Sequence, residues 1–156
     1  MFIDTVRFGK VEIDENKIIN FREGIPGLET YKRFAILQFD GSYPIIWLQS
    51  TEDKSICLPV IDSFLVLPDY SFDISDEEVR QLSLAGPEDL KIISVLVIPE
   101  IIERMTVNLA APIVINTKNS SAMQVILNNG EYNVRFPIFQ DVMRLVKEDK
   151  ADAGTI

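Results

Sequence analysis

The chain has 156 residues, of which 47% are hydrophobic and 25% are charged, values typical of one globular domain with its own buried core. It carries 24 acidic and 15 basic side chains, a net charge of −9, and without a cluster of Lys and Arg this charge argues against direct nucleic-acid binding. A single cysteine and no histidine exclude an internal disulfide, a zinc site of mixed ligands and catalytic arrangements built on imidazole.

The cellular compartment is predicted from what the sequence lacks. The first residues show no charged segment followed by an apolar one, as a secretory signal would. No apolar run approaches the roughly 18 residues that a membrane span requires. Cys57 alone fits a reducing environment. We expect a cytoplasmic chain that does not contact a membrane.

Short segments rich in Val, Ile and Phe follow one another between eight prolines. Several alternate between apolar and polar residues, and this period of two is typical of half-buried antiparallel strands. The predicted strands are 2–8, 11–13, 34–39, 45–49, 56–60, 92–98, 105–109, 113–115, 122–127 and 132–136.

Three turns are predicted from their residues. Asp40-Gly41 and Asn129-Gly130 fit type I′ hairpin turns, which need positive φ at both central positions. The first would join 35–39 to 45–49, and the second would join 124–127 to 132–136. Residues 25–28 fit a type II turn, with Pro26 second and Gly27 third.

Helices are expected at two places only. Ser75 and Glu78 form a capping box, which predicts a short helix that ends near Leu82. Apolar residues of 138–146 have roughly helical spacing and predict either a short amphipathic helix or a frayed end. The expected fold is all-β: an antiparallel, barrel-like single domain, closed or partly open, spanning 1–146, with one or two short helices and a flexible tail at 147–156.

The residues that could carry chemistry have simpler structural explanations. Without a histidine to activate it, Cys57 is interpreted as a buried structural thiol. Gly24 and Gly27 lack the pattern of a phosphate loop and are interpreted as turn residues. Glu52 and Asp53 are adjacent, so on a strand they would point to opposite faces. We therefore expect no catalysis, no cofactor and no metal.

Several motifs occur together in a fixed order. They are Gly24-Ile-Pro-Gly27-Leu-Glu29, Pro44-Ile-Ile-Trp47-Leu-Gln49-Ser50, Phe64-Leu-Val-Leu-Pro68-Asp69-Tyr70, Thr106-Val-Asn108-Leu-Ala-Ala-Pro112-Ile-Val-Ile-Asn116, Gln124-Val-Ile-Leu and Tyr132-Asn-Val-Arg135-Phe-Pro137. This ordered set resembles the flagellar assembly factor FliW family, and the resemblance extends over the chain from about Phe2 to Pro137. The resemblance implies a barrel-like β fold.

The resemblance also implies two protein partners, flagellin and the RNA-binding translational repressor CsrA. In the family the two compete for FliW. When flagellin is exported, freed FliW binds CsrA and relieves the repression of flagellin translation, without occupying the RNA-binding surface of CsrA. The resemblance thus implies a cytoplasmic flagellin chaperone and a CsrA antagonist.

Eight residues are candidates for contact with a partner. Five are acids in a stretch without a base, and an acidic surface suits a basic RNA-binding partner; three others stand in or beside the motifs. They are Asp69, Tyr70, Asp73, Asp76, Glu77, Glu78, Asn108 and Asn116. Pro112 further suggests an edge or bulge at 113–115, to which a partner strand could be added, with Asn116 pointing outward.

Each candidate has an alternative interpretation. The acids could serve solubility alone, Trp47, Leu48, Tyr70 and Phe136 could belong to the core, and both asparagines could satisfy turn backbone groups. Two other functions also stay open. A carbohydrate-binding barrel would have a concave surface lined with exposed aromatic rings, and an enzyme without histidine would have a deep pocket holding a lysine or carboxylate of shifted pKa.

Overall fold

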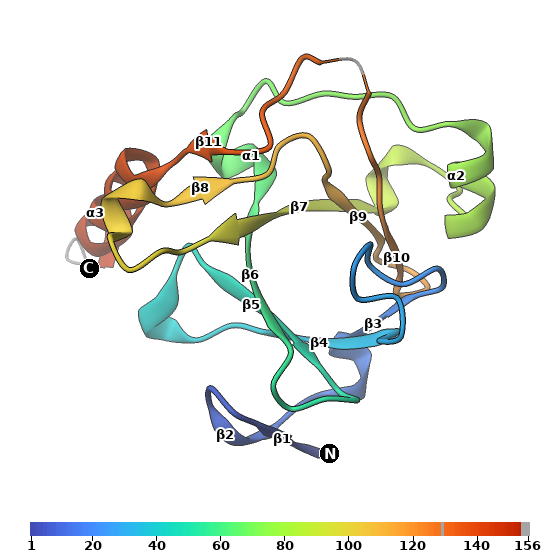
Figure 1. Cartoon of the computed structure of the whole chain (residues 1–156), viewed down its shortest axis with the longest axis horizontal. Coiled ribbons are helices and arrows are strands. Elements are labelled where there is room, and N and C mark those ends of the chain that lie inside the picture. The colour runs from blue at the N-terminus through green and yellow to red at the C-terminus, as the bar shows by residue number, and fades with distance from the viewer. Residues whose placement is uncertain (129, 154–156) are drawn as a thin grey trace.

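A computed structural model describes residues 1–128 and 130–153 (Figure 1). The strands are β1 (Phe2–Thr5), β2 (Gly9–Glu12), β3 (Ile18–Phe21), β4 (Arg33–Leu37), β5 (Ile46–Ser50), β6 (Cys57–Asp62), β7 (Leu90–Val97), β8 (Thr106–Val107), β9 (Ile113–Asn116), β10 (Ser121–Gln124) and β11 (Phe136–Pro137). The helices are α1 (Ser63–Val66), α2 (Asp76–Leu82) and α3 (Phe139–Ala153), and the 3₁₀ turns are η1 (Glu15–Lys17), η2 (Asp40–Ser42), η3 (Pro87–Asp89) and η4 (Ile102–Arg104).

Seven strands close into a barrel in the order β7-β6-β5-β4-β3-β10-β9, and β9 pairs back with β7. Neighbours are antiparallel except β10 and β3, which run parallel. Closure leaves no free edge along the paired parts of these strands. The far end of β7 pairs with β8, and β8 with β11. The expected all-β, antiparallel, barrel-like fold is confirmed.

The barrel interior is filled by alternate residues of its strands, as the period of two requires. Phe21 of β3 and Phe34 of β4 are both fully buried, and their rings meet edge to face with centroids 5.5 Å apart. The other buried members of this core are Ile19, Ile25, Leu48, Val60, Ile93, Ile113, Ile115 and Ala122.

The outer face of the barrel is also apolar where other elements cover it. The β1–β2 hairpin packs Ile3 against Trp47 and its neighbours. The segment with α1 and α3 covers Ile61 and Leu96. The region of α2 covers Val114. A strand that is covered on both faces is therefore apolar at every position of its sequence, as at 113–115.

The observed helices agree in part with those predicted from the sequence. In α2 the Ser75 hydroxyl accepts a hydrogen bond from the Glu78 N–H and the Glu78 carboxylate accepts one from the Ser75 N–H, so the capping box is confirmed. Of the two alternatives left open for 138–146, the amphipathic helix is the one observed, since α3 begins at Phe139. The expected tail from Lys147 differs, because α3 continues to Ala153; residues 154–156 lie outside the described residues. The four-residue α1 was not predicted.

The turns had mixed outcomes. The type II turn is confirmed, since the Leu28 N–H donates to the Ile25 carbonyl at 2.7 Å and Gly27 has φ of 89°. The type I′ turn at Asp40 is wrong: η2 occupies these positions, followed by a cis peptide before Pro44. A longer connection therefore joins β4 and β5, which still pair as a hairpin.

The second predicted hairpin is also wrong, although Asn129 itself lies outside the described residues. Strand β10 pairs with β9 and β3, whereas β11 pairs with β8. The predicted edge at 113–115 is wrong as well, because β9 is paired on both sides and Pro112 precedes it. The strand β3 was missed. Within the described ranges, no helix has both the length and the apolar character to cross a membrane.

Candidate partner-binding surface

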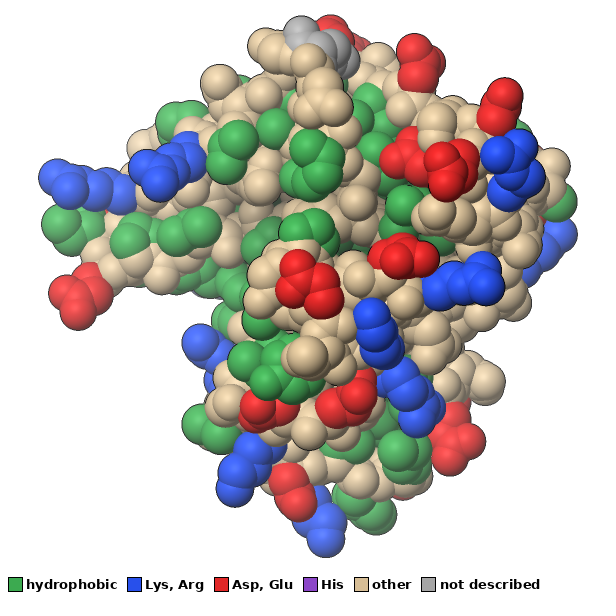
Figure 2. Space-filling view, turned by 45° about the vertical axis from the view of Figure 1, so that its right-hand side comes forward, with side chains coloured by type: hydrophobic (Ala, Val, Ile, Leu, Met, Phe, Trp, Pro, Cys, Tyr) green, Lys and Arg blue, Asp and Glu red, His purple; other side chains and the backbone are tan. Residues whose placement is uncertain are grey.

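The five candidate acids lie along one segment between α1 and the first turn of α2. Asp69, Asp73, Asp76 and Glu77 are exposed, and Glu78 is half-buried. Figure 2 shows the molecule with its α2 side turned forward. Acidic side chains group in the upper right of this view, and several basic side chains lie below them. Three acids in the first turn of α2 also suit its positive N-terminal end.

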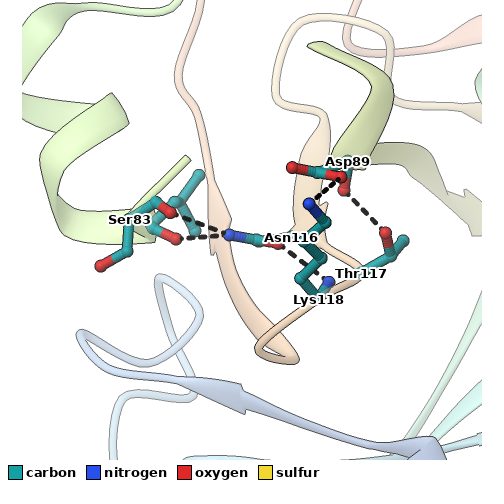
Figure 3. A network of polar contacts seen from close by, with 6 residues as sticks. Ser83, Asp89, Asn116, Thr117 and Lys118 are labelled. Carbon is teal, nitrogen blue, oxygen red and sulfur yellow. Dashed lines mark hydrogen bonds and ion pairs between the residues drawn. The ribbon is translucent and has the colours of Figure 1, made fainter. Parts of the chain in front are cut away.

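The C-terminal end of α2 is fixed to the barrel by a polar network (Figure 3). The Asn116 side-chain amide donates to the carbonyls of Leu82, at 2.8 Å, and Ser83, at 3.3 Å. Its side-chain oxygen accepts from the Lys118 N–H at 3.0 Å. Asn116 ends β9, so one buried side chain ties the acidic helix to the barrel wall.

The same turn between β9 and β10 is held to η3. The Thr117 hydroxyl and N–H both donate to the Asp89 carbonyl, at 2.9 and 2.8 Å. The Lys118 ammonium lies 3.5 Å from the Asp89 carboxylate, which is 7% exposed. The turn therefore connects the C-terminal end of α2, η3 and two barrel strands.

Two of the candidate residues are buried. Tyr70 is 3% exposed and its hydroxyl donates to the Leu109 carbonyl, with the Tyr132 ring 4.7 Å away. Burial, with a smaller contribution from Tyr132, raises the pKa of Tyr70 above its usual value of 10.0. Asn116 is 2% exposed, so the expectation that it points outward is wrong. A partner cannot contact either side chain in this conformation.

Asn108 is half-buried and serves the local backbone. Its side-chain oxygen accepts from the Ala110 N–H at 3.0 Å, and its own N–H donates to the Val95 carbonyl at 2.9 Å. This matches the turn role that was the alternative interpretation of the asparagines. The exposed acids are thus the candidates that stand at the surface without such a role.

The other residues considered for chemistry have structural partners. Cys57 is half-buried, and burial raises the pKa of its thiol. The Glu52 carboxylate accepts from the N–H groups of Lys32 and Arg33. Hydrogen bonds from Ser55 lower the pKa of Asp53. In the part of the chain that the structure describes, no cluster of three or more His, Cys, Asp or Glu could hold a metal ion.

Comparison with known proteins identifies the family. The model of the family described as "FliW protein" matches residues 2–138. A protein of Caldicellulosiruptor saccharolyticus named "Flagellar assembly factor FliW" is 42% identical over 135 residues, covering 86% of this chain and 88% of its own length. The chain belongs to the FliW family.

Other FliW proteins agree over most of the chain. A "Flagellar assembly factor FliW" of Alkaliphilus metalliredigens is 36% identical over 149 residues, 95% of this chain and 92% of that protein. A solved structure, "Crystal structure of the flagellar assembly factor FliW", superposes with a TM-score of 0.82 at 34% identity, covering 89% of this chain and 97% of that one. The resemblance drawn from the ordered motifs is confirmed, and the chain is a flagellar assembly factor of the FliW type.

One surface of this FliW protein was missed from sequence. A groove of about 550 Å³ lies beside η2, where Phe39 and Tyr43 stand exposed next to apolar and charged side chains. Only the exposed aromatic pair around Asp40-Gly41 could have indicated it. Two such rings meet part of what a carbohydrate site needs, but membership of the FliW family favours the flagellar role.

Proposed function

We propose that this FliW protein binds a CsrA-type translational repressor and flagellin in a mutually exclusive way in the cytoplasm, and that it does so without catalysis. Binding of CsrA would relieve the repression of flagellin translation, and binding of flagellin would hold it before export. The observation that carries the proposal is the family match over residues 2–138. Regulation then works by mass action between two complexes.

The charge of the chain supports a basic partner. The net charge is −9, and the exposed acids Asp69, Asp73, Asp76 and Glu77 follow one another along the segment that leads into and begins α2. We assign the contact with CsrA to this acidic segment. Negative potential there would speed association with a basic RNA-binding protein. It would also disfavour RNA near the complex, since RNA binding depends on phosphate contacts.

The proposal is tested by competition between purified proteins. The chain is immobilised, loaded with CsrA, and then exposed to rising concentrations of flagellin. CsrA should leave the surface in proportion to the flagellin bound, because one protein cannot hold both. The amounts of all three proteins on the surface are the measurement.

Two outcomes contradict the proposal. If neither protein binds, the functional assignment falls, although the fold is unaffected. If both stay bound together at saturation, exclusivity is wrong and the two must occupy independent surfaces. Bovine serum albumin, which is acidic, serves as a control for nonspecific displacement.

A further inference from the structure

A groove beside η2 includes none of the residues of the acidic segment. It has a volume of about 550 Å³ and is lined by residues of η2, the start of β5, the end of β6, α1, β7 and α3. In Figure 1, α1, α3 and the connection between β4 and β5 lie on the left, away from α2, whereas β7 crosses the barrel between the two sides. A volume of this size is in the range of ligand-binding clefts.

The groove is lined by buried or half-buried apolar side chains, called its floor below, and by two exposed aromatic rings. Pro44, Ile45 and Leu65 line it, while Phe39 is 38% exposed and Tyr43 is 41% exposed. The Phe39 ring is itself supported by Phe8, at a centroid distance of 4.6 Å. Exposed rings over an apolar floor are typical of sites that accept a partner side chain.

The charged groups of the groove are mainly negative. Asp40, Asp62 and Asp149 contribute three carboxylates, and Lys91 contributes the one ammonium. Among the described residues, no ion pair shorter than 4.0 Å joins Lys91 to any of the three. The groove therefore offers uncompensated negative charge beside aromatic faces.

The groove is also held in shape before any ligand arrives. The Ser42 hydroxyl bonds the carbonyls of Phe39, at 3.0 Å, and Ile45, at 3.1 Å. Asp62 accepts from the Phe64 N–H at 2.9 Å and so fixes the start of α1. Lys91 stands on β7, which is paired with β9 at this point. A preformed groove loses little conformational entropy on binding.

We propose that this groove binds a segment of a partner protein that presents an arginine or lysine flanked by apolar residues. The cationic group would lie against Phe39 or Tyr43 and pair with the carboxylates, while the apolar neighbours cover the floor. The molecule already uses this chemistry, since the Arg7 guanidinium lies 4.6 Å from the Trp47 ring centroid. The apolar floor favours a peptide over a small free cation, which would leave it uncovered.

None of the residues that line the groove belongs to the acidic segment proposed for CsrA, so the two can be tested with different variants. The probe is the peptide acetyl-Leu-Arg-Ile-Arg-Leu-amide, titrated into the full-length, nitrogen-15-labelled chain. Saturable shifts are expected for the amides of Phe39, Asp40, Tyr43 and Lys91. The peptide with both arginines replaced by glutamine should bind at least about fivefold more weakly, since it lacks two charge pairs.

Three variants test whether the peptide binds at the groove. Asp40→Asn with Asp149→Asn should weaken binding about fivefold, and Lys91→Met should tighten it about twofold by removing repulsion. Asp73→Asn with Asp76→Asn makes the same change of net charge outside the groove and should alter the affinity by less than about twofold.

The outcomes against the proposal are distinct. Absence of saturable shifts, or equal binding of the glutamine peptide, overturns it. Equal affinity for spermidine would assign the groove to a small organic cation, and equal loss in the Asp73/Asp76 control would reduce the effect to net charge. None of these results bears on the contact with CsrA that is proposed for the acidic segment.

Discussion

Asn116 makes three hydrogen bonds from a position that is 2% exposed. Two of its acceptors are carbonyls at the C-terminal end of α2, where helix carbonyls have no partner within the helix. A single side chain thus satisfies backbone groups of one element from the end of another. Its contribution to partner binding would come through the placement of α2, and not through contact.

Replacing Asn116 with alanine is expected to lower the free energy of unfolding by about 1–3 kcal/mol, because buried polar groups lose their partners. Asn119 is the matched control: it is exposed, and its amide also donates to the Leu82 carbonyl, at 3.1 Å. Asn119→Ala should cost less than about 1 kcal/mol. Urea denaturation measures both, and equal losses would contradict the role given to Asn116.

Tyr70 links stability to alkaline pH. Because burial raises the pKa of Tyr70 above its usual 10.0, the folded protein keeps this proton where the unfolded chain releases it. The resulting stability is complete below the unfolded pKa and is lost as pH rises from there through the folded pKa. Above about pH 10, the unfolding free energy should therefore fall less steeply with pH in Tyr70→Phe than in the wild type. The difference in slope corresponds to at most about one proton released on unfolding.

Denaturation of both proteins from about pH 8 to about pH 11 measures this difference. At neutral pH the variant should lose about 1 kcal/mol with the hydrogen bond to Leu109. Tyr43→Phe is the control, since Tyr43 is 41% exposed, and it should keep the wild-type decline. A decline in Tyr70→Phe as steep as in the wild type would exclude Tyr70 as its source.

The helix α2 combines a local function with an exposed surface. Glu78 closes the capping box, whereas Asp76 and Glu77 in the same turn are exposed and have no hydrogen bond within the box. Reversing the charge of Glu78 would therefore weaken the helix as well as the surface. Experiments on the surface should leave Glu78 unchanged.

The double substitution Asp73→Lys and Glu77→Lys is expected to weaken CsrA binding about tenfold at low salt and to flatten its salt dependence, because opposite charges are lost at the contact. Glu12→Lys with Glu15→Lys makes the same change of net charge on the distant, exposed start of the chain. This control should lose much less affinity. Equal affinity of the double variant and the wild type would remove the acidic segment from the interface.

At the scale of the whole molecule, closure of the barrel sets the two candidate surfaces apart. The return pairing of β9 with β7 completes the ring. In Figure 1, α2 lies on the right of the ring, whereas α1, α3 and the β4–β5 connection, which contribute residues to the groove, lie on its left. A small acidic protein can therefore present two different faces without a second domain, and this arrangement would allow more than one kind of protein contact.

Features that depend on neighbouring residues could be predicted from the sequence. Each of these features depends on a few adjacent residues only. They are the period of two in the strands, the capping box at Ser75 and the turn at Pro26-Gly27. The order of motifs along the chain was enough to indicate the family. A four-residue element such as α1 is too short to show a helical period and was missed.

The tertiary structure alone decided which strands meet and which side chains are covered. The parallel pairing of β10 with β3, the return of β9 to β7 and the burial of Tyr70 and Asn116 depend on segments far apart in the chain. No local pattern encodes them, because the free energy that selects them comes from packing between distant residues. For the same reason the groove lined by residues as distant in sequence as Phe39, Lys91 and Asp149 could be recognised only in the folded chain.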